Sequence, residues 1–225
     1  MNEKNTKKIL VTGASGYVGS RLVSLLLENK YKVRAASRNP ENLSKFLWAN
    51  NPDIETVKLD ASKRESLVNA CKDCDYVFYF IHSMDETSSD FAETDRIAAR
   101  NMVFASESTG IKRIIYLGGL GNENLHLSKH LSSRREVEEI LKNSQTPVTI
   151  FRSAMIVGSG STSFEILRYL VERLPVMITP RWVQTESQPI AINDVLEYLS
   201  KCLEKEETIG QTFDIGGPEI LSYRN

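Results

Sequence analysis

The sequence predicts an α/β fold in which a doubly wound, parallel β-sheet is covered by helices on both faces. Three observations lead to this prediction. Short apolar runs, typical of buried strands, alternate along the chain with segments whose apolar residues recur at helical spacing. The run at residues 76–81 is continuously apolar, as a central parallel strand requires. A glycine-rich turn joins the first expected strand to the first expected helix.

The individual elements follow from the same patterns. The expected strands are residues 9–11, 31–36, 54–58, 76–81, 112–117, 148–151 and 212–215, and short extended pieces are expected at 176–178 and 189–192. The expected helices are one through residues 18–26, one at 62–71, one at 90–109, one that follows Ser133, one through 164–171, and one from Asn193 or Asp194 to about Glu204. Ser62 with Glu65, and Ser133 with Glu136, have the spacing of a capping box at a helix start.

The glycine turn is the most informative stretch. Residues 9–19 have the sequence ILVTGASGYVG, a strand followed by G-x-x-G-x-x-G and then by an amphipathic helix. Gly13 can form the tight turn, Gly16 can let a pyrophosphate approach the backbone, and Gly19 can let helix and strand pack closely. The pyrophosphate would lie at the helix N-terminus, where unpaired N–H groups and the helix dipole favour an anion. This context predicts a dinucleotide-binding Rossmann fold; the alternative is a glycine turn that serves only topology.

The end of the second strand indicates which nucleotide would bind. An Asp or Glu there would hold the ribose 2′-hydroxyl of NAD, whereas an Arg accommodates a 2′-phosphate. Here Ser37 and Arg38 occupy the place and no acid is present, so NADP(H) is favoured over NAD(H). The alternative is that Arg38 is a solvated surface charge. Asp60, after the third strand, either accepts from the adenine amino group or is an acid near a helix N-terminus.

Composition excludes several other classes of function. The chain has 225 residues, 41% hydrophobic content and a net charge of −1, which gives no electrostatic basis for binding nucleic acid or an anionic membrane. No apolar run reaches the length of a membrane span, and the lysine-rich N-terminus lacks a signal-peptide core, so a cytoplasmic location is expected. Cys71 and Cys74 form a C-x-x-C without a second ligand pair; we expect reduced structural thiols and no metal site.

Four stretches together resemble the atypical short-chain dehydrogenase/reductase superfamily over the whole chain, near its NmrA-like and complex I accessory-subunit branches. They are VTGASGYVG at 11–19, IHSM at 81–84, YLGGLG at 116–121 and PIAINDV at 189–195. The resemblance implies a single domain over residues 1–225, strand order 3-2-1-4-5-6-7, and a small substrate-side lobe from residue 158. Larger relatives carry a further C-terminal region, so this chain, which ends at Asn225, is either a minimal form or truncated.

The resemblance also implies a catalytic Ser-Tyr-Lys set, with the last two as Tyr-x-x-x-Lys on one helix, and this chain departs from it. No tyrosine is followed four residues later by lysine. His130 and Arg134 stand at the matching place, and Gly118 or Gly119 at the serine position. His130 is therefore the candidate proton donor and Arg134 the candidate ribose ligand; the alternative is that His130 lies in a loop before a capped helix.

Further residues at the carboxyl ends of strands complete the expected site, because ligands of such sheets bind there. Arg181 and Trp182 either line a substrate pocket or cap the core. The predicted cofactor-binding residues are Gly13, Ala14, Ser15, Gly16, Tyr17, Val18, Gly19, Ser37, Arg38, Asp60, Ala61, Ile81, His82, Ser83, Gly118, Gly119 and Arg152.

The expected function is that of an NADP(H)-binding protein that reduces a small carbonyl or quinone-like compound without the usual triad. One alternative is a non-catalytic redox sensor or assembly subunit, whose partner would be a protein. A sugar-nucleotide epimerase or dehydratase is a weaker alternative, because the acid–base tyrosine is absent.

Overall fold

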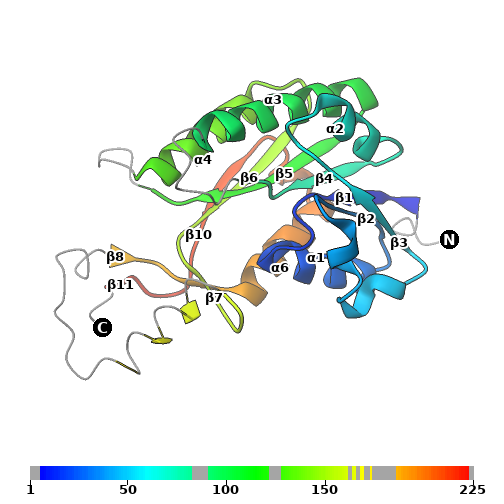
Figure 1. Ribbon diagram of the computed structural model, residues 1–225. Helices are drawn as coiled ribbons and strands as arrows, with labels where there is room; N and C mark the ends of the chain where they lie inside the picture. Colours follow the sequence, from blue (N-terminus) through cyan, green and yellow to red (C-terminus); the bar gives the residue numbers. More distant parts are fainter. Residues whose placement is uncertain are drawn as a thin grey trace.

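The computed structural model describes residues 6–82, 91–121, 128–161, 164–165, 168–169, 173 and 186–222. Its centre is a seven-stranded sheet in which every neighbouring pair is parallel, with helices on both faces (Figure 1). The strands of this sheet are Lys8–Val11 (β1), Lys32–Ser37 (β2), Ile54–Lys58 (β3), Tyr76–Tyr79 (β4), Arg113–Gly119 (β5), Val148–Ser153 (β6) and Thr212–Ile215 (β10). Their order is β3-β2-β1-β4-β5-β6-β10, which confirms both the predicted fold class and the predicted strand order.

The helices form two layers, one on each face of the sheet. They are Tyr17–Glu28 (α1), Arg64–Cys71 (α2), Phe91–Thr109 (α3), Lys129–Lys142 (α4) and Ile192–Lys201 (α6). Helices α1 and α6 cover one face, and α2, α3 and α4 cover the other (Figure 1). Each layer buries aliphatic side chains completely, such as Leu26 and Leu199 on one side and Leu67 and Leu141 on the other. Burial of each such side chain stabilises the fold by roughly 1.5–3 kcal/mol.

Shorter elements complete the described part of the chain. One pair of two-residue strands is parallel, Ile156–Val157 (β7) with Ile190–Ala191 (β9), and another is antiparallel, Glu186–Ser187 (β8) with Leu221–Ser222 (β11). Short 3-10 helices occupy Pro40–Leu43, Leu47–Asn50, Cys202–Glu204 and Glu206–Thr208. The predicted extended piece at 176–178, most of the predicted helix at 164–171, Arg181 and Trp182 lie outside the described residues.

Both predicted capping boxes are wrong. Helix α2 begins at Arg64, and Ser62 instead donates to the Asp60 carboxylate over 2.7 Å. Helix α4 begins at Lys129, and Ser128 caps it by accepting from the backbone N–H of Leu131 over 3.3 Å. Ser133 therefore lies inside α4, where its hydroxyl donates a hydrogen bond to Asp95 of α3. Serine and threonine compete for local hydrogen bonds in several geometries, so the spacing alone does not fix the helix start.

The start and end of the helix α6 also differ from the prediction. Its N-cap is Ala191, without a side-chain hydrogen bond, and Asp194 lies in its first turn. The α-helix ends at Lys201, and the segment predicted as its last turn is the 3-10 helix Cys202–Glu204. A tightened last turn of this kind is common at helix ends.

The three cysteines are free and buried, as expected of structural thiols. Burial raises the pKa of Cys71 to about 12 and that of Cys74 to about 11. Thiols with such pKa values are almost entirely protonated near neutral pH, and the thiol is a poor nucleophile and metal ligand.

A buried arginine, Arg113, connects β5 to neighbouring segments at the amino end of the strand, opposite the glycine turn. The Arg113 guanidinium, 2% exposed, donates to the Thr149 hydroxyl and to the Cys202 carbonyl, over 2.7 Å in each case, and also to the Thr208 hydroxyl. These bonds connect β5, β6 and the segment after α6. Without the guanidinium, several buried acceptors would lose their donor, and each loss is costly.

We predict that Arg113→Met lowers the free energy of unfolding by about 3 kcal/mol or more, because hydrogen bonds from a charged donor are lost in a buried place. Chemical denaturation monitored by circular dichroism measures this. The matched control is Lys112→Met, which removes an exposed ion pair with Asp75 and should cost no more than about 1 kcal/mol. Equal effects of the two substitutions would contradict a structural role for the buried hydrogen bonds.

Candidate cofactor-binding and active site

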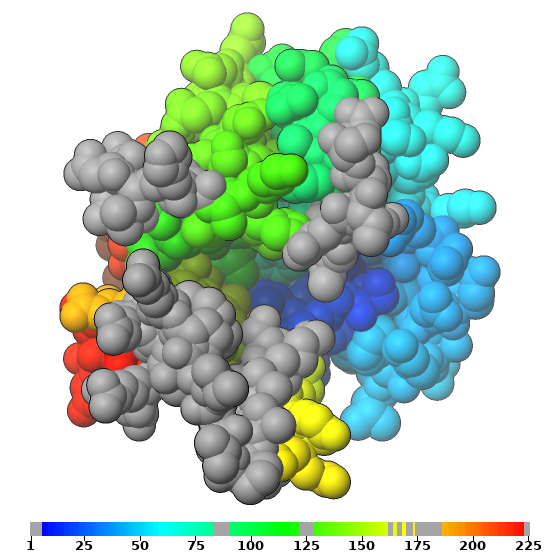
Figure 2. Space-filling view, turned by 60° about the vertical axis from the view of Figure 1, so that its left-hand side comes forward, coloured from blue at the N-terminus to red at the C-terminus, as the bar shows by residue number. Residues whose placement is uncertain are grey.

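The glycine turn lies at the carboxyl ends of β1, β2 and β4, where the strand order reverses: the chain adds β2 on one side of β1 and β4 on the other. The Thr12 hydroxyl donates to the carbonyl of Phe78 over 3.1 Å and accepts from the backbone N–H of Phe80 over 2.9 Å, which fixes the turn to β4. The backbone N–H of Ala14 donates to the carbonyl of Ala36 over 3.1 Å, which fixes it to β2. In Figure 2 the dark-blue N-terminal residues lie in a recess between the green and the yellow segments. Ligands of open α/β sheets bind at such a switch point.

Glycine occupies the three positions of the turn for different physical reasons. Gly13 has φ +65°, and an added Cβ would lie 2.9 Å from the carbonyl oxygen of Phe80. At Gly19 an added Cβ would lie 2.3 Å from the carbonyl oxygen of Gly13. At Gly16 the added atom would meet only that same carbonyl oxygen, at 3.2 Å. The first and third glycines are thus required by packing within the described structure, whereas Gly16 borders open space.

The start of α1 is suited to an anion. Its N-cap is Gly16, no side chain caps it, and its first turn has no acidic residue. Ser15 and Gly16 are exposed. The Tyr17 ring, in contrast, packs under the Arg21 guanidinium at 4.1 Å, and its hydroxyl oxygen is buried. Uncapped N–H groups beside a glycine with space in front of it fit the phosphates of a dinucleotide.

The residues predicted to select the nucleotide are neighbours at the end of β2. The Ser37 and Ser15 hydroxyl oxygens lie 3.5 Å apart, which places the serine of β2 beside the glycine turn. Arg38 directly follows β2 and is exposed. The pKa of Asp60 is lowered, first by its hydrogen bond from Ser62 and, more weakly, by the positive charges of Lys63 and Arg38. Ala61 follows Asp60 on the same loop.

The structure confirms that His130 and Arg134, paired in the sequence, lie on one helix, and it relates His82 to them electrostatically. His82 follows β4, whereas His130 and Arg134 lie on the first two turns of α4. The His130 ring packs against Phe91 of α3, with ring centroids 5.2 Å apart. The alternative that His130 lies in a loop is wrong. Residues four apart on a helix share a face.

Helix α4 comes close to the end of β5 because Gly119 has no side chain there, whereas a Cβ at Gly118 would meet the ring of Tyr116. A Cβ at Gly119 would lie 2.7 Å from Cδ2 of Leu131 and 3.4 Å from Cδ of Arg134. Arg134 is thus held against the carboxyl end of β5, where the superfamily resemblance implies a catalytic serine. Ile81, which follows β4, is partly buried, and Ser83 lies outside the described residues.

His82 is electrostatically coupled to this group. Its pKa is lowered to about 4, first by the loss of hydration among its neighbours and next by the positive charge of Arg134, although part of its surface stays exposed. Asp95 raises it and His130 lowers it. Electrostatic interaction thus connects the end of β4 with side chains of α3 and α4.

Asp95 was not predicted as a site residue, and Ser133 was predicted only as a helix cap. Asp95 is 5% exposed and Ser133 2% exposed, and the Ser133 hydroxyl donates to Oδ2 of Asp95 over 2.9 Å. A signal was available, because Asp95 stands one turn after Phe91 on the same apolar face of α3 as Ala99 and Met102. A carboxylate on a buried face requires a partner and points to a special role.

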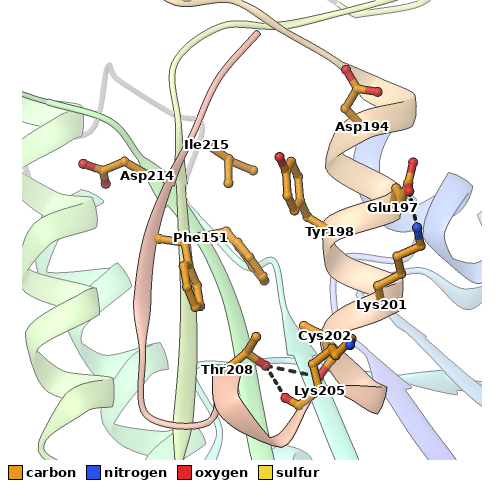
Figure 3. A pocket seen from close by; sticks show the side chains of 11 residues that line it. Phe151, Asp194, Glu197, Tyr198, Lys201, Cys202, Lys205, Thr208, Asp214 and Ile215 are labelled. Atoms are coloured by element: carbon orange, nitrogen blue, oxygen red, sulfur yellow. Dashed lines mark hydrogen bonds and ion pairs between the residues drawn. The ribbon is translucent and has the colours of Figure 1, made fainter. Parts of the chain in front are cut away.

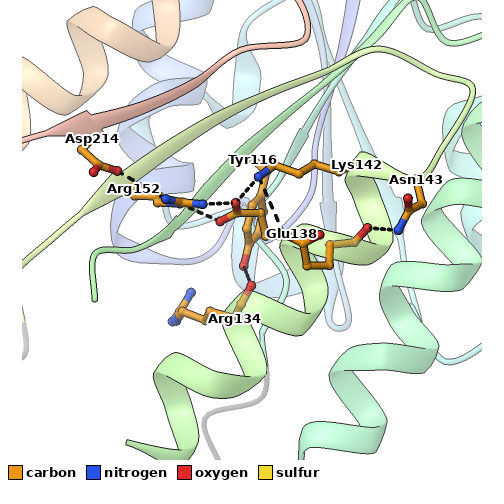
Figure 4. A network of polar contacts seen from close by, with 8 residues as sticks. Tyr116, Arg134, Glu138, Lys142, Asn143, Arg152 and Asp214 are labelled. Atoms are coloured by element: carbon orange, nitrogen blue, oxygen red, sulfur yellow. Dashed lines mark hydrogen bonds and ion pairs between the residues drawn. The ribbon is translucent and has the colours of Figure 1, made fainter. Parts of the chain in front are cut away.

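Arg152 takes part in a polar network at the end of β6 (Figure 4). Its guanidinium donates to both carboxylate oxygens of Glu138, over 2.9 Å in the case of Oε2, and lies 3.8 Å from Asp214. Burial alone would raise the pKa of Glu138, but hydrogen bonds from Arg152 and Lys142 outweigh burial and lower it. These bonds hold the guanidinium of Arg152 within the protein. Contact between Arg152 and a cofactor therefore stays a prediction.

A second hollow lies at the outer edge of the sheet, away from the glycine turn. It has a cavity volume of ≈ 580 Å³ and lies between α6 and the strands β6 and β10 (Figure 3). Phe151, Phe213 and Tyr198 supply aromatic walls, and Lys201 with its partner Glu197 lies at the rim. None of the predicted site residues lines it, so it is separate from the candidate cofactor site.

In the described part of the chain no helix is long and apolar enough to cross a membrane. The same residues contain no group of three or more His, Cys, Asp or Glu side chains arranged to hold a metal ion.

The curated relatives are named as reductases and as a subunit of an NADH dehydrogenase. A dihydroflavonol 4-reductase of Zea mays is 34% identical over 134 residues, which cover 55% of this chain and 37% of the relative. A cinnamoyl-CoA reductase 1 of Petunia hybrida is 27% identical over 54% of this chain and 38% of its own. The NADH dehydrogenase [ubiquinone] 1 alpha subcomplex subunit 9 of Arabidopsis thaliana is 24% identical over 94% of this chain, which spans 54% of that protein.

Solved structures confirm the fold. Pen from Bacillus thuringiensis has a TM-score of 0.82 at 18% identity, over 98% of this chain and 71% of the other. A UDP-glucuronic acid 4-epimerase from Bacillus cereus, solved with NAD, has a TM-score of 0.78 at 21% identity, over 96% of this chain and 80% of the other. The family model for NAD(P)H-binding proteins matches residues 13–175, which include the glycine turn and both turns of α4 that carry His130 and Arg134. The chain therefore belongs to this NAD(P)H-binding family.

Proposed function

We propose that this protein binds NADP(H) and reduces a small carbonyl or quinone-like compound, with His130 and Arg134 in place of the usual tyrosine and lysine. The observation that carries the proposal is that His130 and Arg134 share one face of α4, with Arg134 packed against Gly119 at the carboxyl end of β5. This end of the sheet also carries the glycine turn on the neighbouring strands. A nucleotide whose phosphates lie on the turn extends along this edge.

Preference for NADP(H) rests on charge at the end of β2. Ser37 and Arg38 offer a hydroxyl and a planar cation to a 2′-phosphate, and no carboxylate of β2 opposes it. Asp60 is already held by the hydroxyl and the backbone N–H of Ser62, over 2.7 and 3.1 Å, and Arg38 partly offsets its charge.

The chemistry divides between the cofactor and the chain. A bound dihydronicotinamide supplies a hydride. His130, as an imidazolium, can donate a proton to the oxygen of the substrate, so that a carbonyl becomes an alcohol. The Arg134 guanidinium offers hydrogen-bond donors but no acceptor, so it is suited to hold the ribose or a developing negative charge, not to act as a base.

A non-catalytic role is the second candidate. It is favoured by one comparison, since the relative matched over 94% of this chain is named as a subunit of NADH dehydrogenase, whereas the reductases match about half of the chain. In that role the nucleotide would control the shape of the protein or its binding to a partner. The epimerase alternative is less supported, because two structural neighbours named as epimerases are 21% and 19% identical to this chain, and likeness at such identity supports the fold alone.

Arg38→Ala should weaken NADPH binding by about tenfold to a hundredfold, as expected for loss of one charge-assisted hydrogen-bonded pair, and leave NADH binding nearly unchanged. Fluorescence titration with both nucleotides measures this. The control is Lys32→Ala, which removes an exposed cation at the opposite end of the same strand. Equal affinity of the wild type for the two nucleotides would refute the NADP(H) assignment.

His130→Ala should lower turnover by about 10²–10⁴-fold, as expected for loss of a general acid, with NADPH affinity preserved. The assay follows NADPH oxidation with a panel of aldehydes, ketones and quinones, and Lys129→Ala, exposed beside it on α4, is the control. If no compound oxidises NADPH while the nucleotide changes protease sensitivity, the sensor candidate replaces the reductase. Quinone reduction that ignores the substitution would exclude only the acid role of His130.

Arg134→Gln should raise the pKa of His82 above its value of about 4, because removal of a neighbouring positive charge favours the protonated ring. The pKa should stay below the ordinary value for histidine, because loss of hydration is the larger cause. NMR titration of the ring signals is practical, since the chain has three histidines. Arg100→Gln, on the exposed side of α3, should change nothing; an unchanged pKa in Arg134→Gln would mean that the two residues do not face each other.

A further inference from the structure

A turn at residues 158–161 lies against the first turn of α1. It directly follows β7, which pairs with β9, the strand that leads into α6. The Arg21 guanidinium donates to the carbonyl of Ser159 over 2.8 Å and to the carbonyl of Tyr17, in its own helix, over 3.0 Å. One side chain of α1 thus connects the helix that follows the glycine turn with a segment far along the chain.

The Tyr17 ring forms the other half of this contact. It packs under the Arg21 guanidinium at 4.1 Å. A Cβ added at Gly158 would lie 2.6 Å from the Tyr17 hydroxyl oxygen and 2.7 Å from Cγ2 of Ile192, the first residue of α6. A Cβ added at Gly160 would lie 3.6 Å from a guanidinium nitrogen of Arg21. The absence of a side chain at residue 158 therefore lets the turn approach both α1 and α6.

The turn is closed by hydrogen bonds of its own. The backbone N–H of Ser161 donates to the carbonyl of Gly158 over 3.0 Å, and its hydroxyl donates to the carbonyl of Ile156 over 2.8 Å. Ser161 is 6% exposed, whereas Ser159 and Gly160 are exposed. Because Ser159 lies inside this closed turn, a bond that fixes its carbonyl fixes the position of the whole turn.

The charge of Arg21 lies beside the proposed phosphate site. In the described part of the chain its guanidinium has no carboxylate partner, and both of its hydrogen bonds go to carbonyl oxygens. Tyr17 is the first residue of α1, so its N–H is one of the uncapped groups expected to meet a phosphate. A phosphate bound there orders the first turn of α1 and attracts the guanidinium that holds Ser159.

We propose that Arg21 and the Tyr17 ring clamp the turn 158–161 to α1, so that nucleotide phosphates bound at the start of α1 order this turn. The turn begins the segment that the family resemblance assigns to the substrate side. The clamp then transmits occupancy of the cofactor site to that side, and both residues are positioning residues. The inference rests on the proposed binding of NADP(H), and it applies to the reductase and to the sensor alike.

The test is hydrogen–deuterium exchange, measured by mass spectrometry on the whole chain with and without NADPH. Two peptides are followed, one that covers the glycine turn at 13–20 and one that covers 156–161. In the wild type NADPH should slow exchange in both, by about fivefold or more in the second, the lower end of typical coupling between sites. In Arg21→Met NADPH should slow exchange in the glycine turn alone and should bind about fivefold more weakly, because coupling is reciprocal.

Two substitutions of Tyr17 separate the ring from its hydroxyl. Tyr17→Phe removes a buried hydroxyl that has no hydrogen-bond partner among the described residues, and it should keep the protection of 156–161 because the ring remains. Tyr17→Ala should lose that protection, and it serves as the second test if Arg21→Met does not fold. The matched control is Arg64→Met, which removes an arginine that packs over the Phe104 ring at 4.3 Å at the start of α2 and should behave as the wild type.

The two peptides distinguish failure of the clamp from failure of nucleotide binding. Protection of 156–161 that persists in Arg21→Met would overturn the inference, and so would its absence from a wild type whose glycine turn is protected. The proposed function stands in both cases. A wild type in which NADPH protects neither peptide would overturn the proposed binding of NADP(H) and the clamp with it.

Discussion

The close approach of α1 to the end of β1 is the constraint on which the rest of the structure depends. A single methyl group at Gly19 would lie 2.3 Å from the carbonyl oxygen of Gly13, a distance that no real contact tolerates. Because the helix can come this near, its first N–H groups face the edge of the sheet where β1 and β4 diverge. Thr12 then ties the same turn to β4 through two hydrogen bonds, so the turn has one position.

A second close approach, of α4 to Gly119, organises the other half of the cleft. The two approaches have the same physical basis, which is a glycine at the carboxyl end of a strand that admits a helix to van der Waals contact. The first brings backbone N–H groups to the cleft, and the second brings the side chains of His130 and Arg134. Under the proposed function, the groups that bind the nucleotide and the side chains that act on it are therefore carried by different strands.

Much of the sheet could be predicted from sequence, because buried parallel strands are short continuous apolar runs and glycine spacing marks the first turn. The strand order came from family resemblance, not from the pattern. The start of α4 could not be predicted, since Ser128 and Ser133 are both plausible caps and only tertiary contact with α3 shows that Ser133 is internal. The coupling of His82 to His130 depends on a separation in space that no local pattern encodes.

The layer of α1 and α6 has a consequence for the order in which this chain can fold during synthesis. The side chain of Asn29, just after α1, donates to the hydroxyl of Ser200, 171 residues later, and the apolar faces of the two helices share one core. At translation rates of roughly 5–20 residues per second, α1 waits on the order of ten to thirty seconds for α6 to be made. During that interval the nascent sheet exposes one apolar face while the α2–α4 face can already close. The face that begins with α1, the first helix to be synthesised, is thus the last to be completed, because it needs α6. A chaperone or a second nascent chain would meet the protein on that face.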